Sequence, residues 1–145
     1  MNVKDFMTAD PACCTKETPL QDVARMMFEN DCGEIPVVTS KEDRKPIGVI
    51  TDRDIVVRVV GQGQNALDKR AGDCMSEPCV TVTPEMSLVE CCGLMETHQI
   101  RRVPVVDERG RLCGIVALAD VAEHGGKRTT TELLQQVSQP GPKTH

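Results

Sequence analysis

Two versions of one short stretch decide the fold: Gly-Val-Ile-Thr-Asp-Arg-Asp at residues 48–54 and Gly-Ile-Val-Ala-Leu-Ala-Asp at residues 114–120. In each version, an aspartate follows the glycine by six residues, after an apolar segment rich in Val and Ile. The β-branched residues favour a buried strand, and the residues that follow favour the start of a helix. The two versions are 66 residues apart, which indicates an internal duplication.

The duplication extends upstream of these stretches. Ile-Pro-Val-Val at 35–38 recurs as Val-Pro-Val-Val at 103–106, and Asp-Phe-Met-Thr at 5–8 recurs as Asp-Cys-Met-Ser at 73–76. Both pairs are 68 residues apart, so the turn before the last strand is two residues shorter in the second copy. The period exceeds that of solenoid repeats, and we expect two small units that share a core because neither buries enough surface alone.

Turn-forming residues mark the borders of the two units. A run of Gly and amide residues at 61–65 has no apolar period, which is typical of a linker. We expect a first domain at 2–60, a linker at 61–70, a second domain at 71–128 and a flexible polar tail at 129–145, with a short helix possible at 132–137.

Each unit shows the same order of predicted elements. An outer strand (12–15 or 79–83) precedes an amphipathic helix, for which Thr18 with Pro19, or Ser87 with Glu90, supplies the N-terminal signal. A hairpin and a closing helix follow, at 35–39, 46–50 and 52–60 in the first unit and at 103–107, 112–116 and 118–123 in the second. The order predicts an α+β fold.

Composition excludes several classes of function. The formal net charge of −5 argues against a protein that follows the phosphates of DNA or RNA. No apolar run is long enough to span a membrane, and no export signal is evident near Met1, so we expect a cytoplasmic protein.

The eight cysteines fit a reduced core better than a disulfide framework or a zinc site. The adjacent pairs at 13–14 and 91–92 do not have the spacing of zinc ligands, and we predict no metal site. Redox sensing stays open as an alternative, with Cys74 and Cys79 as the best candidates.

The first copy of the deciding stretch has the chemistry of a nucleotide site. Gly48 permits close approach, the start of the following helix attracts an anion, and Thr51 is able to donate to a phosphate. Asp54 is an acceptor that is able to bind both hydroxyls of a ribose. The same Thr-x-x-Asp spacing is also that of a capping box, which needs no ligand.

The doubled pattern of a helix, an Ile-Pro-Val-Val or Val-Pro-Val-Val strand and Gly-h-h-Thr-x-x-Asp (h, apolar) resembles the CBS domain family over residues 2–124. In particular, residues 51–55 and 98–105 resemble small stand-alone bacterial CBS-pair proteins, including some linked to hypoxia or stress. The resemblance implies two small three-stranded sheets with flanking helices, packed with pseudo-twofold symmetry as a Bateman module. It also implies a homodimer that binds AMP, ADP, ATP or S-adenosylmethionine between the copies, with no further cofactor.

The resemblance also assigns residues to the ligand. Thr51 and Asp54 match the family's hydroxyl and ribose-binding carboxylate, and Ile35, Pro36 and Val37 would line the adenine. The second copy has Ala117 in place of the hydroxyl, so we expect the Asp120 site to be weak or vacant for phosphorylated ligands.

Three arginines are candidates for phosphate binding, with solvated surface charge as the alternative. Arg101 and Arg102 directly precede the second strand motif, Val103-Pro104-Val105, which is the counterpart of the adenine-lining strand. Adjacent strand residues point to opposite faces, so we expect only one of these two arginines to face the ligand. Arg53 is the third candidate.

Three functional hypotheses follow. The leading one is an adenine-nucleotide sensor that regulates a protein partner in trans or acts through its own dimer. The others are a ligand-free dimeric interaction scaffold and a cysteine-based redox sensor. We predict no enzymatic activity, because no nucleophile stands beside a base in the sequence pattern.

Overall fold

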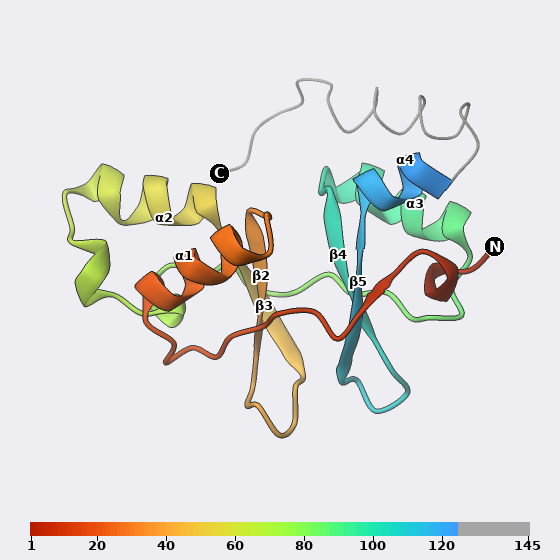
Figure 1. Ribbon diagram of the computed structural model, residues 1–145, viewed down its shortest axis with the longest axis horizontal. Helices are drawn as coiled ribbons and strands as arrows, with labels where there is room; N and C mark the ends of the chain where they lie inside the picture. The colour runs from red at the N-terminus through yellow and green to blue at the C-terminus, as the bar shows by residue number, and fades with distance from the viewer. Residues whose placement is uncertain (125–145) are drawn as a thin grey trace.

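Two β-hairpins stand side by side in the middle of the molecule, and each carries helices on its outer side (Figure 1). The computed structural model describes residues 1–124. The first unit contains α1 (Leu20–Glu29), β2 (Glu34–Val38), β3 (Pro46–Thr51) and α2 (Asp52–Arg58). The second contains α3 (Leu88–His98), β4 (Arg102–Val106), β5 (Leu112–Ala117) and α4 (Leu118–His124). The expected α+β fold of two tandem units is confirmed.

The two hairpins have the same antiparallel register. Pro36 lies opposite Val49 in the first, and Pro104 lies opposite Ile115 in the second. Both ladders shift register at the last pair before the turn. The two copies are therefore equivalent position by position, which is the basis of the pseudo-twofold relation.

The outer strands differ from the prediction. Residues 12–15 and 79–83 contribute only isolated parallel bridges, from Cys14 to Val37 and from Val82 to Val105. In the first unit the ladder stops after Cys14, because the backbone N–H of Thr15 donates to Thr18 Oγ1 instead of to a neighbouring strand. Only one residue of each predicted strand, Cys14 or Val82, therefore forms a bridge to the neighbouring hairpin.

Each hairpin is completed at its other edge by the segment that starts the opposite copy. β1 (Thr8–Ala9) pairs antiparallel with β5 of the second unit. The equivalent segment of the second copy forms a bridge from Ser76 to Val49 of the first unit. Figure 1 shows the N-terminal segment running from the second unit across to α1.

The exchanged segments also complete the cores. The structure has two apolar clusters, one for each unit, where the sequence predicted a shared core. Val3 is buried in the cluster of the second unit, while Cys74 and Met75 belong to that of the first. Burial of side chains supplied by the other copy holds the pair together.

The first turn of α1 also corrects a prediction. Thr18 does not cap this helix, since its Oγ1 accepts from Thr15, and the N-cap position is taken by Pro19 without a side-chain hydrogen bond. In the second unit, Ser87 Oγ accepts from the backbone N–H of Glu90, as expected for an N-cap.

The predicted linker at 61–70 contains the short 3-10 turns η2 (Val60–Gln62) and η3 (Ala66–Asp68), and a third, η4 (Ala71–Asp73), follows it directly. The predicted tail at 129–145 and its short helix lie outside the described residues. Within residues 1–124, no helix has the length and apolar character needed to cross a membrane.

The turns of the two hairpins also touch. The backbone N–H of Leu112 donates to the carbonyl of Arg44 at 2.7 Å, and the Arg111 guanidinium donates to the carbonyl of Glu42 at 2.9 Å. These bonds join the units at the hairpin tips. The space between the units lies toward the opposite end, where β2 and β4 begin.

Candidate functional site

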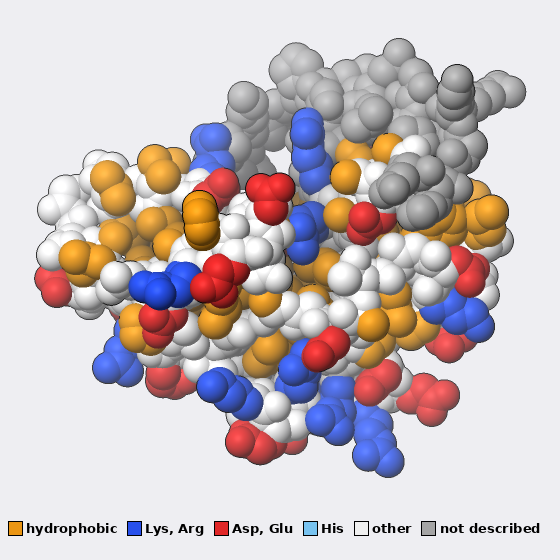
Figure 2. Space-filling view, viewed as in Figure 1, with side chains coloured by type: hydrophobic (Ala, Val, Ile, Leu, Met, Phe, Trp, Pro, Cys, Tyr) orange, Lys and Arg blue, Asp and Glu red, His pale blue; other side chains and the backbone are white. Residues whose placement is uncertain are grey.

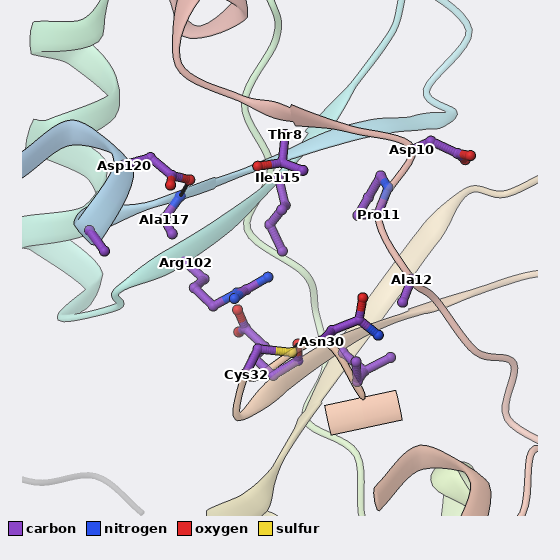
Figure 3. A pocket seen from close by; sticks show the side chains of 13 residues that line it. Thr8, Asp10, Pro11, Ala12, Asn30, Cys32, Arg102, Ile115, Ala117 and Asp120 are labelled. Carbon is purple, nitrogen blue, oxygen red and sulfur yellow. Dashed lines mark hydrogen bonds between the residues drawn. The ribbon is translucent and has the colours of Figure 1, made fainter. Parts of the chain in front are cut away.

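A cavity of about 310 Å³ lies between the units, and we call it the Asp120 cavity (Figure 3). Its walls come from the N-terminal segment, the end of α1, the starts of β2 and β4, and the junction of β5 with α4. The lining residues are Thr8, Asp10, Pro11, Ala12, Asn30, Cys32, Glu34, Ile35, Arg102, Ile115, Ala117, Ala119 and Asp120. Because both units contribute, the cavity exists only in the assembled pair.

Asp120 keeps most of its hydrogen-bonding capacity. Among the described residues, its carboxylate accepts one hydrogen bond, from the backbone N–H of Ala117 at 3.4 Å. Its small neighbours Ala117 and Ala119 leave the approach open, and Arg102 points into the space between Asp120 and Cys32 (Figure 3). An ionised carboxylate with free acceptor sites suits a pair of hydroxyl groups.

A second cavity, of about 420 Å³, lies at the start of α2, and we call it the Thr51 cleft. Three arginines from two elements line it, together with two acidic residues. The lining residues are Gly33, Glu34, Thr51, Asp52, Arg53, Gln99, Ile100, Arg101 and Arg102. This concentration of guanidinium groups suits a phosphate.

Thr51 and Asp54 form a complete capping box at the start of α2. Thr51 Oγ1 accepts from the backbone N–H of Asp54 at 3.0 Å, and Asp54 Oδ2 accepts from that of Thr51 at 3.0 Å. Ser76 Oγ donates to Asp54 at 3.4 Å, and Arg58 Nε lies 3.7 Å from Asp54 Oδ1. The Asp54 side chain is 13% exposed and already has protein partners.

Gly48 is required for packing between the copies. A Cβ at this position would collide with the Met75 methyl group and the carbonyl oxygen of Ser76. The close approach that the sequence suggested is therefore made by residues 75–76 of the second copy, which cross to the first unit and which we call a crossing segment, as we do their counterparts at residues 7–8. Ser76 also bridges to Val49.

The structure divides the predicted site residues into three groups. Thr51, Arg53, Arg101 and Arg102 line the Thr51 cleft, whereas Ile35, Arg102 and Asp120 line the Asp120 cavity. The remaining predicted residues line neither of these two cavities: Gly48, Asp54, Pro36, Val37, Val103, Pro104 and Val105. Val37, Val103 and Val105 instead belong to the cores.

Arg101 and Arg102 both line the Thr51 cleft, and that only one of them faces the ligand stays a prediction. β4 begins at Arg102, so Arg101 precedes the strand and strand alternation does not apply to it.

Glu34 is one of the site residues that the sequence analysis missed. It lines both cavities, as does Arg102. Glu34 and Arg102 are 68 residues apart and occupy the same position in the two hairpins, opposite Thr51 and Ala117 respectively. Alignment of the two copies at this position would have shown an acidic residue in one copy and a basic residue in the other.

The environment of Glu34 opposes its ionisation. Burial raises the pKa of Glu34 to about 7; the charge of Arg102 works against this rise and the charge of Asp54 adds to it. Glu34 Oε2 and Arg102 Nε are buried without a hydrogen-bond partner in the described part of the chain. Buried polar atoms of this kind are costly unless a ligand or water satisfies them.

The cysteines are all free, and the two candidates for redox sensing are poorly placed. Cys74 is buried, and burial raises its pKa, while burial and the nearby Glu34 raise the pKa of Cys79 to about 12. Thiols with raised pKa values stay protonated at neutral pH and react slowly. Within residues 1–124, no group of three or more His, Cys, Asp or Glu side chains is placed to hold a metal ion.

The family model of the CBS domain matches this chain twice, at residues 3–61 and at residues 71–126. Among curated proteins, it is 40% identical over 121 residues to the CBS domain-containing protein YhcV of Bacillus subtilis, covering 83% of both chains. It is 33% identical over 137 residues to Hypoxic response protein 1 of Mycobacterium tuberculosis, covering 94% of both. An uncharacterized protein of Methanopyrus kandleri, MK0525, is 39% identical over 120 residues, which are 83% of this chain and 58% of that protein.

Solved structures show the same arrangement. The Hypoxic Response Protein I structure, which has two coordinated zinc ions, has a TM-score of 0.77 and 36% identity, covering 87% of this chain and 100% of that one. The CBS domain pair of MJ0100, in complex with 5′-methylthioadenosine and S-adenosylmethionine, has a TM-score of 0.75 and 24% identity, with coverage of 87% and 100%. A hexameric CBS-CP12 protein from bloom-forming cyanobacteria has a TM-score of 0.72 and 26% identity, with coverage of 86% and 70%.

Proposed function

Because the chain belongs to the CBS domain family, we propose that it is a regulatory module that binds an adenosyl ligand between its units and acts on a protein partner in trans. The observation that carries the proposal is the Asp120 cavity. It combines an open carboxylate with aliphatic walls from Ile35 and Ile115, and its volume of about 310 Å³ falls in the range of small-molecule sites. MJ0100, which has the same fold, binds adenosyl compounds.

In the proposed complex, Asp120 accepts hydrogen bonds from the ribose hydroxyls, and Ile35 and Ile115 pack against the base. Asp10, Glu34 and Asp120 make this cavity acidic, with Arg102 as the cation in its lining. It therefore favours the nucleoside end of an adenosyl ligand, or the cationic S-adenosylmethionine.

The Thr51 cleft receives the phosphates of AMP, ADP or ATP in this proposal. Arg53, Arg101 and Arg102 supply its positive charge, and Thr51 also lines it. The two cavities thus differ in the ligands that they favour. We expect a titration with AMP to show unequal sites, and two equivalent sites would contradict this assignment.

The proposed activity is binding and regulation without catalysis. A ligand that contacts both units biases the angle between them, provided that it binds one arrangement more tightly than the other. The partner then binds one arrangement of the units in preference to the other.

Thermal unfolding with a panel of AMP, ADP, ATP, S-adenosylmethionine and 5′-methylthioadenosine tests the proposal. A ligand that binds only the folded chain stabilises it by about 2.7 kcal/mol at a hundred times its Kd, so the midpoint must rise with concentration. The variant Asp120→Ala tests the site, since it should remove the rise in midpoint for the unphosphorylated ligands. Midpoints that no compound changes would contradict the proposal.

A ligand-free scaffold is the second candidate, and the complete capping box at Thr51 and Asp54 favours it. In that case these residues serve only to start α2. The same thermal panel separates the two functions, because the scaffold predicts no shift with any adenosyl compound.

Either function is compatible with a homodimer formed through the exposed apolar side chains around α1 and α2. Phe28 is 87% exposed and Val56 is 59% exposed, with Val57, Val60 and Leu67 nearby in the sequence of α2 and the following turns. Figure 2 shows hydrophobic side chains on this end of the molecule. A surface of this kind is typical of a protein interface.

Sedimentation velocity tests the dimer. We expect the wild-type chain to sediment as a dimer and the double variant Phe28→Ser, Val56→Asp to sediment as a monomer with unchanged circular dichroism. A monomeric wild-type chain would contradict the dimer.

A further inference from the structure

Glu34 and Arg102 form one charged pair that serves two cavities. Glu34 starts β2 and Arg102 starts β4, so the pair lies between the units at the end opposite the hairpin tips. Both residues line the Asp120 cavity and the Thr51 cleft. A single guanidinium therefore faces two possible ligands.

Glu34 and Arg102 interact through their charges, without a hydrogen bond or a close ion pair between their side chains. In the described part of the chain, Glu34 Oε2 and Arg102 Nε lack any hydrogen-bond partner although both atoms are buried. No ion pair of 4.0 Å or less joins the two side chains among the ion pairs of residues 1–124. Arg102 is thus free to move toward a ligand at little cost in hydrogen bonds.

The remaining charges around Glu34 are mostly acidic. Asp54 on α2 acts on Glu34 directly, and Asp120 on α4 shares its cavity. The Asp52 carboxylate adjoins Gly33, and the charge of Glu34 acts on the thiol of Cys79. Arg53 and Arg101 line the Thr51 cleft together with Glu34. When Arg102 turns away, the nearby carboxylates leave an ionised Glu34 poorly compensated.

We infer that a phosphate in the Thr51 cleft draws Arg102 away from Glu34, so that Glu34 takes up a proton and nucleotide binding becomes linked to pH. This inference rests on the proposed function, because it requires a phosphorylated ligand in that cleft. It also couples the cavities, since Arg102 cannot serve a phosphate in both.

The direction of the pH effect follows from the state of Glu34. With a pKa of about 7 in the free protein, Glu34 is largely protonated well below pH 7, and binding there takes up no proton at this residue. Loss of Arg102 raises the pKa further, so uptake is greatest just above pH 7. Affinity for the nucleotide therefore falls as the pH rises above 7.

Isothermal titration calorimetry with AMP at pH 7.8 tests the inference in HEPES and in Tris, which differ in their heats of ionisation. The AMP phosphate is nearly fully ionised at this pH and contributes little to the proton balance. We expect the wild-type chain to take up roughly half a proton per AMP bound. Glu34→Gln should bind AMP without this uptake, and Glu42→Gln, in an exposed turn, should behave as the wild type.

Arg102→Met supplies a second readout if Glu34→Gln does not fold. It should bind AMP at least tenfold more weakly and show no uptake, because Glu34 has already lost its cation. Equal proton uptake by the wild type and Glu34→Gln would overturn the inference while leaving the proposed function intact. Absence of any AMP binding by the wild type would overturn the inference, whereas only the absence of a midpoint shift with every compound of the thermal panel would overturn the proposed function as well.

Discussion

The junction of β3 with α2 and the junction of β5 with α4 occupy equivalent places, yet their aspartates have different surroundings. Asp54 is bound by the N–H of Thr51, by Ser76 and by Arg58. Asp120 accepts one long hydrogen bond from Ala117 among the described residues and faces a cavity. The two copies therefore hold one carboxylate among protein partners and leave the other facing a cavity.

The crossing segments account for much of this difference. Ser76 reaches Asp54 from the segment that crosses into the first unit, whereas its counterpart Thr8 lines the Asp120 cavity. Arg58 closes the first site further by donating to the carbonyls of Cys74 and Met75. The position of Ser76 and Thr8 therefore helps to close one site and borders the other.

The largest contrast should appear at the two strand glycines. In Gly48→Ala the new methyl group meets the backbone of Ser76, which cannot move without shifting the crossing segment, and we expect a loss of about 3 kcal/mol in unfolding free energy. In Gly114→Ala the nearest atom is Met7 Sδ at 2.7 Å, on a flexible side chain, and we expect a loss of about 1 kcal/mol. Urea denaturation measures both, and equal losses would contradict the asymmetry.

Removal of each carboxylate should affect ligand binding differently. A hydrogen bond to a charged group contributes roughly 1.5–3 kcal/mol, so Asp120→Ala should weaken 5′-methylthioadenosine binding by about ten- to a hundredfold. Asp54→Ala should leave that affinity within about twofold, since Asp54 does not line the Asp120 cavity. Calorimetric titration decides between them; a larger loss for Asp54→Ala would reverse the assignment of the two sites.

Glu34→Gln should change the pH dependence of stability. The pKa of Glu34 rises from 4.5 to about 7 on folding. The folded state therefore binds the proton more tightly, and this contribution to stability is lost as the pH rises from about 4.5 through 7. The amide has no such loss, so its stability relative to the wild type should be about 2 kcal/mol greater at pH 8 than at pH 5. A constant difference across this range would show that Glu34 ionises normally.

The smallest contrast concerns the hydroxyl that only the first copy has. Thr51→Ala removes the side chain that accepts from the N–H of Asp54, and we expect a loss of about 1 kcal/mol. Ala117→Thr offers the equivalent cap to α4 and should gain about 0.5 kcal/mol. Chemical denaturation of both variants checks the pair, and a loss in Ala117→Thr would mean that the second junction cannot accommodate a cap.

The sequence predicted the parts of the fold that depend on local pattern. The β-branched runs around Gly48 and Gly114 predicted β3 and β5, and the Thr-x-x-Asp spacing predicted the capping box of α2. Local pattern did not reveal that Thr8 and Ala9 pair with the second copy, because a two-residue strand has no periodicity to identify its partner. The exchange of segments is a tertiary property.

Only part of the candidate site could be predicted, because the rest also depends on tertiary structure. Thr51, Asp120 and the arginines were identified from residue chemistry and family resemblance. Glu34 was missed because an isolated acidic residue before an apolar strand is usually solvated. Glu34 belongs to the site because the packing of the two units brings it to the same cavities as Arg102.

The proposed function requires that an adenosyl ligand binds between the units at Asp120. A crystal structure of the chain grown with saturating 5′-methylthioadenosine would show whether it does. We expect electron density for the ligand in the Asp120 cavity, with both ribose hydroxyls within hydrogen-bond distance of the Asp120 carboxylate. An empty cavity, or a ligand bound elsewhere with Asp120 uncontacted, would contradict it.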